Sequence, residues 1–406
     1  MKIQNLVLGI MAFACLNSAT QAAFIEDTKG QIYLKNFYFD RDYSDQTTDL
    51  SNWSQAVSLF VNSGYTDTPI QMGLDLSARY AYRLSPAKDI VDNVMPYDEY
   101  DHKQAQDQLK LGGAIKLKYS NTELKIGEFT PKLPIVHTDV AMQLPTTFLG
   151  GMIESTDIKN TKITAGRLTK VSGRNAEDYS KFQLSNGTTK AKTDALNFIG
   201  ADYDYKDQQF RYFFADLENI YNQHFLSYEY RHAFNENLRL KSNFYLFDTY
   251  DSGDSLEGNI DSLALATIHM LTYGNHTFGA GYKHMSGDTK FPLLANWVPQ
   301  LYLANWSVGT YMQQDEHSWQ IRYDYDFKET PFNGLKSTLR YYYGDNIKTA
   351  TGNDGIEKEL DFILNYEFSQ SKLKGFSLSW LIADYKNSTS KDYLENRLSA
   401  TYTLTF

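Results

Sequence analysis

The sequence predicts an all-β protein, an 18-stranded antiparallel transmembrane β-barrel with one loop folded into its lumen. Apolar and polar residues alternate with a period of two in segments of roughly ten residues along most of the chain. Tight turns alternate with long polar connections, which is the asymmetry between the two ends of a membrane barrel. The last alternating segment ends on an aromatic residue, Phe406, as the final strand of an outer-membrane barrel does.

The composition excludes several classes of protein. The 406 residues include 39 basic and 49 acidic side chains, a formal net charge of −10, so we expect no nucleic-acid partner. Beyond residue 23 no apolar run reaches the length of about 18 residues that a membrane-spanning helix needs. Aromatic residues nevertheless make up 15% of the chain and include 31 tyrosines. Tyrosine and tryptophan gather at boundaries between an apolar phase and water, so this excess favours a membrane interface.

The first 23 residues have the pattern of a secretory signal peptide. Lys2 supplies the charge, Leu6–Leu16 the apolar stretch and Asn17–Ala23 a small, polar cleavage region, with cleavage after either of its last two residues. A lipoprotein acceptor at Cys15 is the alternative, but this cysteine lies inside the apolar stretch and lacks a leucine three residues before it. We therefore expect residues 24–406 to form one barrel domain without cysteine or disulfide.

The alternation can be followed along the chain. In residues 72–83 one face carries Met72, Leu74, Leu76, Ala78, Tyr80 and Tyr82, and the other carries Asp75, Ser77, Arg79 and Arg83. The same pattern recurs in residues 319–327, 335–344, 357–368, 375–385 and 397–406. A soluble sheet would alternate too, but these apolar faces end in aromatic residues, as interfacial girdles do. Of 19 candidate spans, 302–312 alternates least cleanly, and removing it leaves the even number that a single-chain barrel needs.

The connections between these spans fall into two kinds. Tight turns are predicted at 121–122, 207–208, 235–237 and 331–334, and long polar stretches at 84–107, 169–193 and 345–356. Residues 130–150 differ from both because three prolines prevent a strand while the segment is unusually apolar. We expect this segment to be a constriction loop buried in the lumen, with a surface loop packed on a neighbour as the alternative. Its candidate pore residues are Lys132, His137, Asp139, Met142 and Gln143.

If the apolar face of each strand meets lipid, the opposite face lines the lumen. That face carries 14 cations, Lys35, Arg79, Arg83, Lys110, Lys116, Lys118, Lys125, Arg211, Arg239, Lys241, Lys283, Arg322, Arg340 and Arg397. The acidic residues on it are mainly Asp75, Asp202, Asp324, Glu359 and Asp361. The sequence therefore predicts a basic lumen inside an acidic protein, and charges in a confined pore act more strongly than surface charges. For any single residue, the alternative is a solvated side chain without a role in selectivity.

An ordered series of motifs resembles the OprD-type (Occ) substrate-specific outer-membrane porins of pseudomonads and their relatives. Phe24-Ile25-Glu26-Asp27 and the following Leu34–Asp42 are similar to the family's FIED and LRNYYFNRD signatures. Further blocks match in order at Glu123–Glu128, Leu144–Thr147, Asp216–Gln223, Gly287-Asp288, Leu303–Asn305 and Ser318–Asp324. The similarity covers the whole chain after the signal peptide.

The resemblance implies an 18-stranded monomer that passes small carboxylate-bearing solutes along a basic ladder. Lys35, Lys283, Arg322, Arg340 and Arg397 lie on the matching strands, and we add Arg239, Lys241, Asp324 and Asp361 as further candidates for the solute path. The chain departs from the family pattern where relatives often have arginine. It has Met142 and Gln143 in the constriction loop, and Ser377, Ser379 and Leu381 in the penultimate strand.

These observations predict a channel in the outer membrane of a Gram-negative bacterium for amino acids or small organic or aromatic acids. A sugar-selective or general porin is one alternative, and a secreted or surface β-rich binding protein is another. No P-loop, G-x-S-x-G or H-E-x-x-H pattern occurs after residue 23, so we expect no enzyme, cofactor or metal; an outer-membrane lipid hydrolase would need a Ser–His pair that the sequence does not place. The expected partners are outer-membrane lipid and lipopolysaccharide, small solutes and the barrel assembly machinery. We expect a monomer, with a trimer as the alternative.

Overall fold

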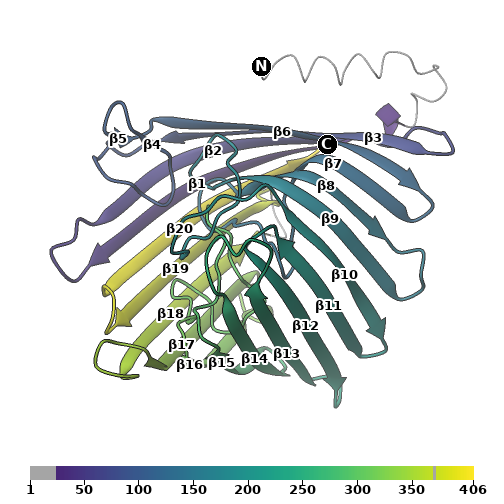
Figure 1. Ribbon diagram of the computed structural model, residues 1–406. Coiled ribbons are helices and arrows are strands. Elements are labelled where there is room, and N and C mark those ends of the chain that lie inside the picture. The colour runs from purple at the N-terminus through teal and green to yellow at the C-terminus, as the bar shows by residue number, and fades with distance from the viewer. Residues whose placement is uncertain (1–23, 369–371) are drawn as a thin grey trace.

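The computed structural model describes residues 24–368 and 372–406, and the predicted signal peptide, residues 1–23, lies outside the described residues. Eighteen antiparallel strands form one closed barrel, as predicted (Figure 1). Its strands are β1 Lys29–Tyr43, β2 Leu50–Asn62, β3 Gln71–Arg83, β6 Asp107–Tyr119, β7 Thr122–Phe129, β8 Thr147–Ser155, β9 Thr161–Ser172, β10 Leu196–Tyr205, β11 Gln208–Leu217, β12 Tyr221–Ala233, β13 Leu238–Asp251, β14 Asp261–Tyr273, β15 His276–Ser286, β16 His317–Asp326, β17 Leu335–Ile347, β18 Gly355–Glu367, β19 Phe376–Asn387 and β20 Tyr393–Thr405. The short strands β4 Tyr97–Asp98 and β5 Lys103–Gln104 pair separately within a connection. Across the described ranges, no helix has both the length and the apolar composition to cross a membrane.

The barrel closes where the first strand meets the last. β1 pairs with β2 on one side and with β20 on the other, so Lys35 lies opposite Ala56 and Thr401. The backbone of Gly30 exchanges hydrogen bonds of 2.7 and 3.0 Å with Phe406, and these two bonds continue the ladder to the end of the chain. Gly30 and Phe406 therefore lie at the end of the barrel with the short turns, which is the periplasmic end in outer-membrane barrels.

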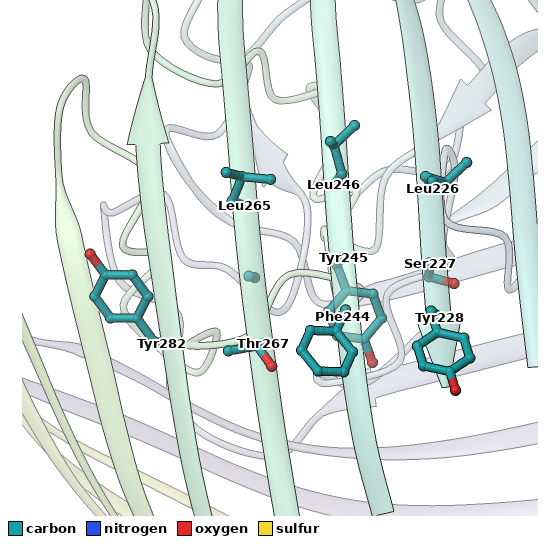
Figure 2. A pocket seen from close by; sticks show the side chains of 10 residues that line it. Leu226, Ser227, Tyr228, Phe244, Tyr245, Leu246, Leu265, Thr267 and Tyr282 are labelled. Carbon is teal, nitrogen blue, oxygen red and sulfur yellow. The ribbon is translucent and has the colours of Figure 1, made fainter. Parts of the chain in front are cut away.

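The outward face of the strands is apolar and aromatic. Leu226, Phe244 and Leu265 are each more than 40% exposed on neighbouring strands, which fits contact with lipid rather than water. A shallow hollow of about 310 Å³ is lined by these residues together with Leu246 and Tyr282 (Figure 2). Because the hollow lies on the outer wall, it is separate from the lumen.

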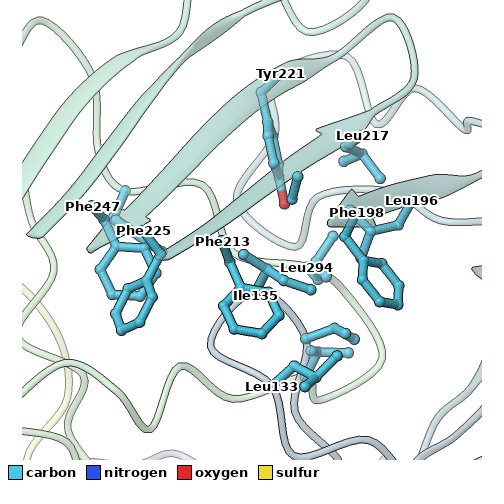
Figure 3. Close-up of a cluster of buried hydrophobic side chains, with 14 of the residues drawn as sticks. Leu133, Ile135, Leu196, Phe198, Phe213, Leu217, Tyr221, Phe225, Phe247 and Leu294 are labelled. Carbon is cyan, nitrogen blue, oxygen red and sulfur yellow. The ribbon is translucent and has the colours of Figure 1, made fainter. Parts of the chain in front are cut away.

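Residues 130–146 connect β7 to β8 and fill the interior of the barrel. At one end, Leu133 and Ile135 pack with Phe213 and Phe225 of the barrel wall and with Leu294 of the connection 287–316 (Figure 3). At the other end, Met142 and Leu144 belong to a second buried cluster, which includes Phe37 and Phe39 of β1 and Val94 and Met95 of the connection 84–106. The loop therefore spans the lumen between two parts of the wall.

One predicted boundary needs correction. Residues 147–150 belong to β8, because the backbone of Thr147 and its neighbours pairs with β9 as soon as the proline-containing segment ends. The constriction loop is accordingly 130–146 rather than 130–150. Residues 302–312, the weakest of the predicted spans, lie in the connection 287–316, which agrees with leaving them out of the strand count.

Candidate functional site

Four connections from the long-loop end meet inside the barrel. These are residues 84–106, 130–146, 173–195 and 287–316. Gln300 donates a hydrogen bond of 2.8 Å to the carbonyl of Pro134, which joins the last connection to the constriction loop. Sequence reasoning identified by position only residues 130–150 as inward. The connections 84–106 and 173–195 are polar and read as solvent loops, and part of the more apolar connection 287–316 was counted as the weak candidate span 302–312. The adjacent apolar pair Val94 and Met95, both fully buried, was the signal for the connection 84–106.

The centre of the constriction contains three cations and two carboxylates. We call Lys35 of β1, Arg174 of the connection 173–195 and Arg397 of β20 the cation cluster. The ammonium of Lys35 bonds to the carbonyl of Met142, while Gln143 donates a hydrogen bond of 3.2 Å to the carbonyl of Lys35. The loop residues Met142 and Gln143, predicted at the constriction, are therefore fastened directly to β1.

Carboxylates neutralise part of this cluster. Arg174 forms an ion pair with Asp139 at the tip of the constriction loop. Burial lowers the pKa of Arg174, the Asp139 carboxylate opposes that shift, and Arg397 lies close enough to add to the lowering. The fully buried Glu395 accepts a bond of 2.5 Å from Arg397 and also pairs with Arg41 of β1. Sequence reasoning missed Arg174, Arg41 and Glu395.

A second charged group lies on β16, β17 and β18. Arg322 and Arg340 face each other across the sheet, a like-charge pairing that two carboxylates relieve. Arg322 forms two hydrogen bonds with Asp324, of 2.7 and 2.8 Å, and its side chain keeps 31% exposure. Arg340 bonds to Asp361 at 2.7 Å, and its side chain is 15% exposed. Arg322 is therefore the more open of the two cations to a passing solute.

Other predicted site residues lie away from this centre. Lys283 is fully buried, and its ammonium donates hydrogen bonds of 3.1 and 2.9 Å to the carbonyls of Asn305 and Thr310. It thus anchors the connection 287–316 to the wall. Arg239 and Lys241 lie near the short-turn end of β13, where both are exposed and Lys241 pairs with Glu229.

Within the constriction loop, Lys132 and His137 form a backbone bridge that closes a small turn. The hydroxyl of Tyr302 donates a hydrogen bond of 2.9 Å to the carbonyl of Lys132, so the connection 287–316 also holds this turn. Burial lowers the pKa of His137. This side chain is therefore neutral near pH 7.

The lumen carries more acid than the sequence reasoning counted. Glu229, Glu357 and Glu395 also face inward, in the same alternation that identified their neighbours. Glu128 could not be found in this way, because Gly127 has a φ of 139° and breaks the alternation. Glu128 turns inward and accepts a hydrogen bond of 2.9 Å from Arg79. Most inward cations therefore have a carboxylate or carbonyl partner, and the predicted excess of 14 cations over about five acids is too large.

This arrangement can hold anions and dipolar solutes. A partly exposed guanidinium whose partner carboxylate lies to one side attracts a solute carboxylate while staying neutralised when the channel is empty. In residues 24–368 and 372–406, no group of three or more histidine, cysteine, aspartate or glutamate side chains could hold a metal ion.

Comparisons with known proteins agree with this architecture. The family model for the outer membrane porin, OprD family, matches residues 22–406. The porin-like protein GalP of Pseudomonas putida is 28% identical over 100% of this chain and 99% of its own length. The crystal structure of Acinetobacter baumannii OccAB4 superposes with a TM-score of 0.89 at 35% identity, covering 93% of this chain and 98% of that one. Pseudomonas aeruginosa OpdK, crystallised with vanillate, superposes with a TM-score of 0.89 at 30% identity, covering 94% and 100%.

Proposed function

The chain belongs to the OprD family of outer-membrane porins, and on this premise we propose that it conducts small carboxylate-containing solutes, such as amino acids and organic or aromatic acids, across the outer membrane of a Gram-negative bacterium. The observation that carries the proposal is the open side of Arg322, with Arg340 opposite it and the cation cluster at the constriction. The OpdK structure holds vanillate, an aromatic carboxylate, in the same fold. The proposed solute path runs past Arg397, Arg340 and Arg322 toward Arg239 and Lys241.

A sugar-selective porin is the nearest alternative. Such a channel would present inward aromatic faces along its path, yet Phe37, Phe213, Phe247 and Tyr342 are each at most 2% exposed and are used in packing. Tyr245, a fifth inward aromatic residue, is only partly buried but packs against the cluster that contains Phe213 and Phe247. This distribution favours carboxylates over sugars. A secreted binding protein is ruled out because OprD-family proteins are outer-membrane proteins.

An outer-membrane lipid hydrolase also remains without support. The structure brings Ser242 Oγ within 2.9 Å of His269 Nδ1 on the outward face, a pair that the sequence did not indicate. The other nitrogen of His269 lies 3.0 Å from the Thr267 hydroxyl, which itself donates to the carbonyl of Asn243. A hydroxyl rather than a carboxylate orients this imidazole. We therefore interpret Ser242, His269 and Thr267 as polar side chains that satisfy one another's hydrogen bonds on the lipid-facing side.

We further propose that the chain acts as a monomer of residues 24–406 after removal of residues 1–23. Its partners would be lipid and lipopolysaccharide around the outward face and the barrel assembly machinery at the carboxy-terminal strand. The exposed ring of Phe406 at the end of β20 supports the last of these, because it stays accessible in the closed barrel.

Uptake into liposomes tests the proposed selectivity. We would compare glucuronate with glucose, which share a ring and differ by the carboxylate, in vesicles with and without the protein. We expect faster entry of glucuronate at low concentration. Equal rates, or a preference for glucose, would contradict the proposal.

A further inference from the structure

Arg174 contacts three other connections at once. It belongs to the connection 173–195 and is 6% exposed. Its Nε donates a hydrogen bond of 2.9 Å to the carbonyl of Asn93 in the connection 84–106. Its guanidinium pairs with Asp139 of the constriction loop and lies 4.1 Å from the ring centroid of Trp297 in the connection 287–316. A single side chain therefore links the connections 84–106, 130–146, 173–195 and 287–316.

The neighbouring Asn175 reinforces this junction. Its amide donates a hydrogen bond of 3.2 Å to the carbonyl of Asp92 and accepts one of 2.9 Å from the indole of Trp297. Asp92 in turn is held by Asn52 of β2 and Gln104, both at 2.7 Å, so the connection 84–106 is tied to the wall. The contacts of Arg174 thus extend to fixed parts of the barrel.

The chemistry of the junction requires arginine. A planar guanidinium donates in its plane to Asn93 and Asp139 while its face lies against the Trp297 ring, whereas a lysine ammonium cannot do all three. The other inward cations make fewer such links; Lys35, for example, fastens only the constriction loop to β1.

From these contacts we propose that Arg174 is a positioning residue that sets the aperture of the constriction by joining its four inward connections. The inference rests on the proposed channel function, since an aperture has meaning only for a conducting pore. Its consequence is that the limiting size of permeant solutes depends on a residue outside the strands. Lys35 and Arg397 would still supply positive charge when Arg174 is replaced.

The decisive variant is Arg174→Lys, because it keeps the charge and loses the three-way geometry. In planar bilayers we would measure single-channel conductance, the largest polyethylene glycol that enters the pore, and the reversal potential under a salt gradient. We expect conductance to rise about twofold and the polymer cut-off to increase, with an unchanged reversal potential, because pore diameter and lining charge control different quantities. Arg174→Gln should widen the pore equally and also shift the reversal potential away from anions.

Two controls keep the test specific. Lys181→Gln alters an exposed ion pair with Asp194 in the same connection and should behave like the wild type. Asp139→Asn and Trp297→Leu each weaken one of the three contacts of Arg174, and Trp297→Leu also removes the indole bond to Asn175. Both should give smaller increases than Arg174→Lys. Heat-shifted migration in detergent gels would show that each barrel is closed.

Wild-type conductance and cut-off in Arg174→Lys would overturn the proposal. A reversal-potential shift in Arg174→Gln without any change in cut-off would also overturn it, since Arg174 would then act only through its charge. Uptake of glucuronate against glucose by the wild type is a separate measurement, so failure of the proposed carboxylate selectivity can be told from failure of this inference.

Discussion

Replacing Arg322 tests whether paired lumen arginines attract solutes by charge. Arg322→Gln leaves Asp324 in the lumen without its partner, whereas Arg322→Gln combined with Asp324→Asn removes the whole pair without changing the net charge. Arg322 suits this test better than Arg340, because removing Arg340 would leave the fully buried Asp361 uncompensated and could destabilise the wall. The charged form of Arg340 is stabilised when Arg322 is replaced, because the repulsion between the two facing arginines disappears.

The magnitude follows from the pair geometry. At an effective dielectric constant of about 20, a solute carboxylate about 4 Å from the guanidinium gains about 4 kcal/mol, and the Asp324 carboxylate about 7 Å away repels it by about 2 kcal/mol. The intact Arg322–Asp324 pair then attracts the solute carboxylate by a net of about 2 kcal/mol, which corresponds to about 30-fold in affinity. The double variant loses this net attraction, whereas the single variant loses the attraction and keeps the repulsion.

Because the Arg322 side chain is 31% exposed, solvent screening reduces both losses but preserves their order. We expect uptake of glucuronate to fall about tenfold or more in the single variant and several-fold in the double variant. Glucose uptake should change little in either. Liposome assays at low solute concentration would measure these rates. Equal losses in the two variants, or equal losses for glucuronate and glucose, would refute the electrostatic reasoning.

Three further predictions concern assembly, aperture and pH. Deleting Phe406 removes the last ladder bonds to Gly30 and should lower the amount of heat-modifiable barrel in outer membranes; unchanged amounts would contradict this. Shortening the loop between Lys132 and Gln143 should raise single-channel conductance, and an unaltered value in an inserted variant would show that the loop does not narrow the pore. Burial lowers the pKa of His137, so the packed loop binds a proton less readily than the released loop does. Acidification below about pH 6.5 therefore destabilises the packed loop relative to the released one, and this effect stops growing once the pH is below the lowered pKa. Current fluctuations should therefore increase from pH 7 to pH 5 in the wild type and not in His137→Gln; equal increases would assign the effect to another group.

Several features of the fold were predictable because their cause is local. Side chains on a strand alternate between its faces, so the inward positions of Arg322, Asp324 and Arg397 followed from the sequence alone. The apolar, proline-containing segment predicted as 130–150, of which the structure keeps 130–146 as loop, could be placed in the lumen because such a segment is poorly accommodated in water. Both inferences agree with the structure.

Other features depended on conformation that the sequence pattern does not contain. The φ of 139° at Gly127 turns Glu128 inward, and a Cβ at Gly112 would lie 2.0 Å from its Oε1, so two glycines make room for this carboxylate. A strict alternation would place Glu128 on the lipid-facing side of β7. Lys283 faces the inside of the barrel, as predicted. That its ammonium binds backbone carbonyls depends on the path of the connection 287–316, which the sequence pattern does not contain.

The sequence by itself determined the strands, the face that each side chain takes and the aromatic end of the chain, because a period of two is a property of neighbouring residues. Only the tertiary structure decided which charges neutralise each other and where the polar connections go. Arg41 and Glu395, for example, are separated by 354 positions in sequence and meet at 2.6 Å because β1 closes the barrel against β20. Arg174 lies in a connection whose polar composition is that of a solvent loop, and it became part of the constriction because Asn93, Asp139 and Trp297 converge on it from three other connections. Such convergence depends on the closed barrel, since no local pattern records which distant segments will share its interior.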